Sequence, residues 1–286
     1  MNKKPYKKGS NGFKFILIFI GIVVLGGMLF ANGAFPSFEK SIPLPLNPDS
    51  ELQTPNASSG QSNLQLQTFG FKDCGKLVAI DLLVDSSGSM GSGSKMLQLQ
   101  NGLREMTSQY PDNGVIGMQM FNAPDYTPPN GAKELVPISL YKNVKSQISS
   151  AINGLIPNGA TYSKNAFEFV RPKLQAAKTA FPDYKINLIF VSDGVPEAYS
   201  PPNPPPPGPG RFNPVQDPSS VAQLVKSDGI RIFSIAYLDQ TDQTDNTKLE
   251  QLMTNVASSA DDFYKAPTSN EITSILKQIT AKICKQ

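Results

Sequence analysis

The chain has 286 residues, of which 39% are hydrophobic, enough for one substantial core or at most two small ones. Five lysines fall within the first fourteen residues, so the formal charge of +3 hides a remainder with 21 basic and 23 acidic groups, or −2. Because no clustered basic surface remains for a phosphate backbone, nucleic-acid binding is excluded.

The chain begins with a basic tail and an apolar segment. Residues 15–31 form the uncharged run FILIFIGIVVLGGMLFA, which we expect to be an N-terminal transmembrane helix that anchors the chain in the cell membrane. Residues 1–14 then form a cytoplasmic tail, and the positive-inside rule places the rest of the chain outside the cytoplasm. Small residues at 31, 33 and 34 also permit signal-peptide cleavage, in which case the protein is secreted.

A spacer and a cysteine pair frame the remaining sequence. Residues 32–73 are rich in Pro, Ser, Asn and Gln, a composition typical of a flexible linker, so we expect one folded domain at 74–286. Cys74 precedes the first core strand and Cys284 ends the last helix. If the domain termini meet outside the cytoplasm, a disulfide is favoured, and two free thiols are the alternative.

Strand-like and helix-like patterns alternate after Cys74. Strands are expected at 77–84, 115–121, 134–140, 186–191, 230–237 and 263–264. A helical stripe runs through Met96, Leu99, Leu103, Met106 and Tyr110, and further helices are expected at 143–155, 165–180 with an interruption near Pro172, 219–227, 248–258 and 269–283. The alternation predicts an α/β fold whose sheet is largely parallel and covered by helices on both faces.

Two segments depart from this alternation. The strand at 134–140 follows a loop of Asn, Pro and Gly without a preceding helix, so we expect it to run antiparallel at an edge of the six-stranded sheet. Residues 200–214 contain a proline-rich run, which we expect to project as an extended insertion.

Oxygen-bearing side chains follow the first strand at every second position, at Asp85, Ser87 and Ser89. A hard cation such as Mg²⁺ prefers such oxygens, but these three under-fill and under-neutralise it. Two further loops can contribute at the carboxyl ends of the strands, one carrying Thr161 and the other carrying Asp193 after a buried strand. The pattern therefore predicts a metal site that is completed from several loops and by an acidic group of a partner.

These three motifs, in this order, resemble the von Willebrand factor type A family over about residues 76–283. DxSxS after the first strand, Gly-x-Thr before a helix and Asp-Gly after the fourth strand are the parts of that family's metal-ion-dependent adhesion site. The resemblance implies a Rossmann-like, doubly wound sheet in which the first and fourth strands are neighbours. It also implies that Ser87 and Ser89 bind the metal directly, Asp85 and Asp193 directly or through water, and Thr161 depending on conformation.

Enzyme functions receive little support from the sequence. The chain contains no histidine, which removes Ser-His-Asp and Cys-His mechanisms. Ser92 and Lys95 fit the S-x-x-K spacing of serine–lysine acyltransferases, but the same spacing occurs at two other places in the chain. A serine–lysine hydrolase and a metal-dependent hydrolase are therefore minor alternatives, and we expect the protein not to be an enzyme.

The resemblance and the anchor together predict a membrane-tethered, extracytoplasmic domain. We expect it to bind a protein partner through Mg²⁺, or through Mn²⁺ or Ca²⁺, with the partner offering an acidic side chain to the metal. Adhesion or assembly of a surface complex is the expected purpose. The alternative is a permanent scaffold subunit of an envelope, secretion or pilus-like assembly.

Overall fold

The structure is a computed structural model that describes residues 69–74, 77–122, 131–196, 214–238, 243–266 and 271–285. Leu64–Gln286 forms one compact unit. The expected transmembrane segment at 15–31, most of the expected linker and almost all of the proline-rich insertion lie outside the described residues. Within the described ranges, every helix is too short or too polar to cross a membrane.

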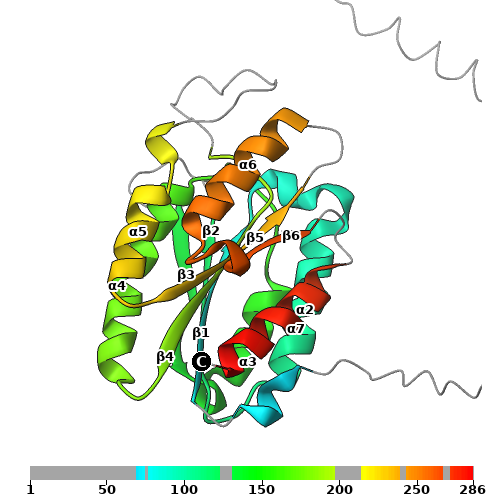
Figure 1. Cartoon of the computed structure of the whole chain (residues 1–286). Helices are drawn as coiled ribbons and strands as arrows, with labels where there is room; N and C mark the ends of the chain where they lie inside the picture. The colour runs from blue at the N-terminus through cyan, green and yellow to red at the C-terminus, as the bar shows by residue number, and fades with distance from the viewer. Residues whose placement is uncertain are drawn as a thin grey trace, which may run out of the picture. The chain divides into compact units, whose positions relative to one another are not determined.

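One six-stranded sheet forms the centre of the domain, in the order β3-β2-β1-β4-β5-β6 (Figure 1). Its strands are β1 (Val78–Asp85), β2 (Val115–Phe121), β3 (Ala132–Leu140), β4 (Lys185–Ser192), β5 (Arg231–Tyr237) and β6 (Phe263–Ala266). All neighbouring strands pair in parallel except the edge strand β3, which runs antiparallel to β2. The mostly parallel sheet with one antiparallel edge strand is thus confirmed.

Helices cover both faces of the sheet, as Figure 1 shows. One face packs against α2 (Lys95–Ser108), α3 (Tyr141–Asn153) and α7 (Ile272–Cys284), and the other against α4 (Ser163–Ala180), α5 (Ser219–Ser227) and α6 (Gln243–Val256). All eight residues of β1 are buried, because a central parallel strand contacts helices on both sides. The chain continues from β1 to β2 on one side and from β4 to β5 on the other side, so the strand order reverses between β1 and β4. The carboxyl ends of these two strands therefore meet at the switch point of the sheet.

The expected interruption of a helix near Pro172 is wrong, since α4 is continuous. Proline lacks an amide hydrogen and disturbs a helix interior at a cost of about 3 kcal/mol. However, Phe167, Val170 and Leu174 on the inner face of α4 are fully buried against the sheet. Burial of each contributes about 1.5–3 kcal/mol, so packing outweighs the local defect.

The expected disulfide between Cys74 and Cys284 is confirmed, with Cα atoms 4.6 Å apart across a sequence separation of 210 residues. It joins the residue that follows the short 3₁₀ helix η1 (Gly70–Asp73) to the last residue of α7. The bond therefore closes nearly the whole domain into one covalent loop.

The middle of β1 contains a buried carboxyl group. Asp81 is 0% exposed, and its Oδ1 accepts a weak hydrogen bond of 3.4 Å from Gln119 Nε2. Asp81 Oδ2 and Gln119 Oε1 have no hydrogen-bond partner among the described residues. Burial raises the pKa of the Asp81 carboxyl from its ordinary 3.8 to about 7.

Candidate metal centre

Two neighbouring strands bring the first two carboxylates of the site together. Asp85 is the last residue of β1, and Asp193 directly follows β4. The register pairs Val84 of β1 with Val191 of β4. Asp85 and Asp193 therefore both lie at the carboxyl end of the sheet. Asp85 is completely buried and Asp193 is 8% exposed.

Hydrogen bonds fix the Asp85 carboxylate at both oxygens. Oδ1 accepts from the Ser87 amide at 2.7 Å, and Oδ2 accepts from Ser192 Oγ at 2.6 Å. Burial, together with the nearby Asp193 charge, raises the pKa of Asp85 to about 7. The cost of holding two carboxylates this close is reduced by any cation that binds between them.

The serine hydroxyls connect the two carboxylates. Ser87 Oγ lies 3.0 Å from Ser89 Oγ, and Ser89 Oγ donates to Asp193 Oδ1 at 2.7 Å. Ser87 lies between β1 and the 3₁₀ helix η2 (Gly88–Ser94), and Ser89 is the second residue of η2. The structure therefore brings the DxSxS loop and the Asp-Gly loop into direct contact.

Backbone hydrogen bonds bring the third loop to the same place. The Asn158 amide donates to the Ser86 carbonyl at 2.8 Å, and the Gly88 amide donates to the Gly159 carbonyl at 3.0 Å. Thr161 follows in this loop and is 2% exposed. All five residues expected to bind metal, Asp85, Ser87, Ser89, Thr161 and Asp193, are consequently gathered from three loops at one end of the sheet.

Gly194 sets the distance between Thr161 and the Asp-Gly loop. A Cβ atom at Gly194 would lie 2.9 Å from Thr161 Oγ1, so a methyl group there must displace the hydroxyl. We expect Gly194→Ala to weaken divalent-cation binding about tenfold, as measured by calorimetric titration. Gly91→Ala is the matched control, because its Cβ would meet nothing closer than Pro157 Cβ at 3.5 Å. Equal affinities of the two variants would show that Thr161 Oγ1 does not contribute.

Two residues of the site were not predicted from the sequence. Ser192 ends β4 and donates to Asp85, and its only signal was its place directly before Asp193. Lys95 begins α2, and its Nζ donates to Asp193 Oδ2 at 2.6 Å. The S-x-x-K spacing had marked Lys95 for acyl transfer, but its ammonium group forms an ion pair with a carboxylate.

The donors fit a hard cation. They are two carboxylates and three hydroxyls, the oxygen ligands that Mg²⁺, Mn²⁺ and Ca²⁺ prefer over nitrogen or sulfur. In the part of the chain that the structure describes, His, Cys, Asp and Glu form no group of three that could hold a metal by themselves. The hydroxyl groups of Ser87, Ser89 and Thr161 are oxygen donors that can add to the two carboxylates in the coordination of an ion.

Comparisons with known proteins agree with this arrangement. Residues 80–278 match the family model described as von Willebrand factor type A domain. No curated protein sequence matches the chain. Among solved structures, proximal thread matrix protein 1 of the mussel byssus superposes with a TM-score of 0.55 at 17% identity, covering 74% of this chain and 49% of that one. One structure of the mussel protein has a zinc-occupied MIDAS motif.

Two bacterial pilus proteins are also similar. The pilus adhesin SpaC from Lactobacillus rhamnosus GG has a TM-score of 0.56 at 20% identity, with 73% of this chain and 30% of that chain covered. The von Willebrand factor domain of the type V pili tip protein Mfa5 from Porphyromonas gingivalis has a TM-score of 0.55 at 13% identity, with 73% and 95% covered. At these identities the similarity establishes the fold, and the chain spans about half the length of the mussel protein.

Proposed function

The chain belongs to the von Willebrand factor type A family, and on that premise we propose that it binds an acidic side chain of a protein partner through a divalent cation. The ion would be held by the five oxygen-bearing residues of the site, Asp85, Ser87, Ser89, Thr161 and Asp193. A cation bound there supplies a positive centre that accepts a carboxylate oxygen of the ligand. The observation that carries the proposal is the convergence of three loops on two buried carboxylates.

The chain's own residues prepare the site before any ligand arrives. Ser192 and the Ser87 amide hold Asp85 in one orientation, while Ser89 orients Asp193. Because the Asp85 and Asp193 side chains are buried and already hydrogen-bonded, little rotamer entropy is lost when an ion binds. A rigid donor set of this kind is suited to recognition, and the lack of histidine leaves it without the usual proton shuttle. We therefore propose a binding protein and not an enzyme.

The biological setting is also part of the proposal. We propose that residues 15–31 anchor the chain in the cell membrane, with the domain outside the cytoplasm for adhesion or surface-complex assembly. The disulfide supports an oxidising location, because such bonds persist mainly outside the cytoplasm. The similarity to a pilus adhesin and a pilus tip protein supports a role at a surface. A permanent scaffold subunit would use the same site, and a stable complex after detergent extraction would favour it.

Removal of the buried carboxylate tests the metal centre. We expect Asp85→Asn to weaken Mn²⁺ and Mg²⁺ binding at least about 100-fold in calorimetric titration, because the other carboxylate of the candidate site, Asp193, is paired with Lys95. Asp183→Asn is the control, since Asp183 is an exposed carboxylate in the turn before β4. An unchanged affinity in Asp85→Asn would place the cation elsewhere.

A small carboxylate tests the ligand chemistry. Acetate should bind the Mn²⁺-loaded protein, and the relaxation of its methyl protons should be faster than with the Asp85→Asn variant at the same Mn²⁺ concentration. If relaxation is the same with both proteins, the cation does not recruit carboxylates at this site.

A further inference from the structure

A lysine lies inside the candidate metal centre, and its partner is one of the expected ligands. Lys95 Nζ binds Asp193 Oδ2 at 2.6 Å, while Oδ1 of the same carboxylate accepts from Ser89 Oγ at 2.7 Å. The Asp193 side chain is fully buried, and 12% of the Lys95 side chain is exposed. The pair therefore lacks the solvent screening that makes ion pairs at the surface weak.

The backbone before Lys95 adopts an uncommon conformation. Gly93 and Ser94 have φ angles of 58° and 62°, and Ser94 is the only non-glycine residue with positive φ in the described ranges. A left-handed serine costs energy, and such residues persist where the surrounding structure requires them. The two residues end η2 with a kink in the backbone, and α2 begins immediately afterwards with Lys95 beside the site. The Tyr237 hydroxyl donates to the Lys95 carbonyl at 3.5 Å.

Lys95 changes the charge of the site. The loops at 85–95, 154–162 and 192–196 carry three charged side chains, which are those of Asp85, Asp193 and Lys95. With both carboxylates ionised their sum is one negative charge, and with a divalent cation bound it becomes one positive charge. Without the lysine, the same loaded site is neutral. An acidic ligand is attracted to a positive site and gains little from a neutral one.

We propose that Lys95 sets the balance between metal affinity and ligand affinity at this centre. The Lys95 ammonium group binds Asp193 Oδ2 and repels a cation at the site, which lowers the metal affinity. When the metal is bound, the same ammonium group gives the site the net positive charge that attracts a carboxylate. This inference rests on the proposed function. It assigns Lys95 as a positioning and specificity-determining residue, and it predicts that the two affinities change in opposite directions when its charge is removed.

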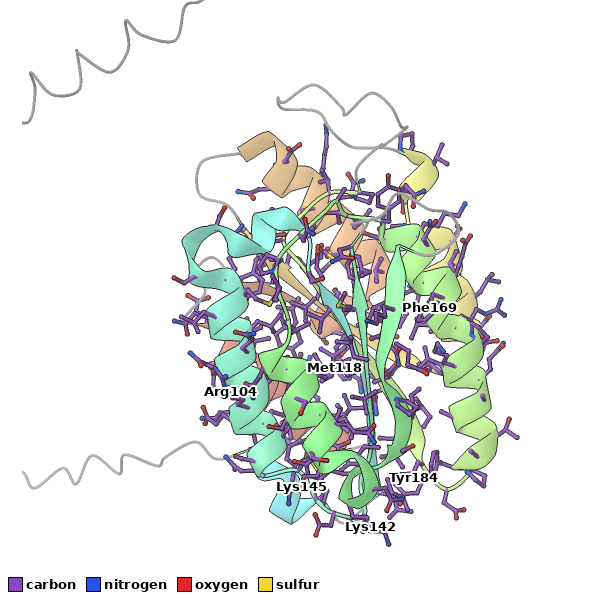
Figure 2. The ribbon with its side chains drawn as sticks, turned by 180° about the vertical axis from the view of Figure 1, so that it is seen from behind. Arg104, Met118, Lys142, Lys145, Phe169 and Tyr184 are labelled. Atoms are coloured by element: carbon purple, nitrogen blue, oxygen red, sulfur yellow. A yellow bond between two sulfur atoms is a disulfide. The ribbon has the colours of Figure 1, made fainter. Side chains whose placement is uncertain are left out.

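The test is Lys95→Gln, which keeps an N–H donor near Asp193 but removes the charge. We expect the Kd for Mn²⁺, measured by calorimetry, to fall about tenfold, and the Kd of acetate for the Mn²⁺-saturated protein, measured by proton relaxation, to rise about tenfold. Lys95→Arg keeps the positive charge and should leave both affinities closer to the wild-type values than Lys95→Gln does. Lys142→Gln is the control, because it makes the same change in net charge near the start of α3. This position lies at the end of the sheet away from the candidate metal centre (Figure 2).

The outcomes separate this inference from the proposed function. The inference is supported if Lys95→Gln binds Mn²⁺ more tightly and acetate more weakly than the wild type, while Lys142→Gln binds both as the wild type does. Weakening of both affinities, or no change in either, overturns it, while Mn²⁺ binding by the wild type sustains the proposed function. No Mn²⁺ binding by the wild type overturns both. Should Lys95→Gln fail to fold, a folded Lys95→Arg variant that has lost its acetate affinity would also contradict the charge mechanism.

Discussion

Replacing both cysteines, Cys74→Ala with Cys284→Ala, should lower the free energy of unfolding by about 5 kcal/mol, the largest single effect expected for this domain. The disulfide closes a loop with a sequence separation of 210 residues. In the chain-entropy account, such a cross-link restricts the unfolded chain most strongly when the loop is long. A loss of this size is a large share of the 5–15 kcal/mol that is typical of a folded domain.

Urea unfolding followed by circular dichroism checks this expectation. The wild type under reducing conditions should unfold at the same urea concentration as the double alanine variant, and the variant should not respond to reductant. The slope of the unfolding transition should increase, since the uncrosslinked chain exposes more surface. A loss below about 1 kcal/mol would mean that the unfolded chain stays compact without the bond.

Local patterns in the sequence were sufficient to predict most of the fold. The buried parallel strands were found within a few residues because they form nearly continuous apolar runs, interrupted by Asp81 in β1 and by Asn187 in β4. The edge position of β3 followed from its missing crossover helix. The continuity of α4 through Pro172 could not be found in this way, because long-range packing decides it and the local rule predicts a break.

The site was predictable to the extent that its residues lie in recognisable loops. Asp85, Ser87 and Ser89 were predicted from their spacing after the first strand, Asp193 from its place after a buried strand, and Thr161 from the Gly-x-Thr motif before a helix. Lys95 and Ser192 were missed, since a lysine at a helix start and a serine at a strand end are common features of surface turns. Their roles depend on which carboxylates the sheet register brings within reach, and the spacing of residues along the chain does not reveal this.

The substitution Asp81→Asn should stabilise the domain by about 4 kcal/mol at pH 8. Asp81 is 0% exposed, and its pKa is raised to about 7 because burial disfavours the charged form. The difference between a pKa of 3.8 and one of about 7 corresponds to about 4 kcal/mol. Asparagine has nearly the same shape and carries no charge, and its Oδ1 can accept the hydrogen bond from Gln119 Nε2 that Asp81 Oδ1 accepts.

The sign of the effect follows from proton binding. Between pH 3.8 and about 7 the folded state keeps the Asp81 proton that the unfolded state releases, so the wild type loses stability as the pH rises. The difference between variant and wild type should be near zero below pH 4 and grow by about 1.4 kcal/mol per pH unit. It should level off above pH 7, where both states are ionised.

Chemical denaturation at unit pH intervals from 4 to 9, in the presence of EDTA, measures this difference. Asp85 titrates in the same window, but it does so in both proteins and cancels when one curve is subtracted from the other. Asp183→Asn is the control and should stay within about 0.5 kcal/mol of the wild type at every pH, because its carboxylate is exposed. A variant that is less stable than the wild type at pH 8 would show that the charged carboxylate is held by interactions that outweigh its burial. The Asp81 carboxylate would then be a stabilising element of the sheet, unlike the buried Asp85 carboxylate at the metal centre.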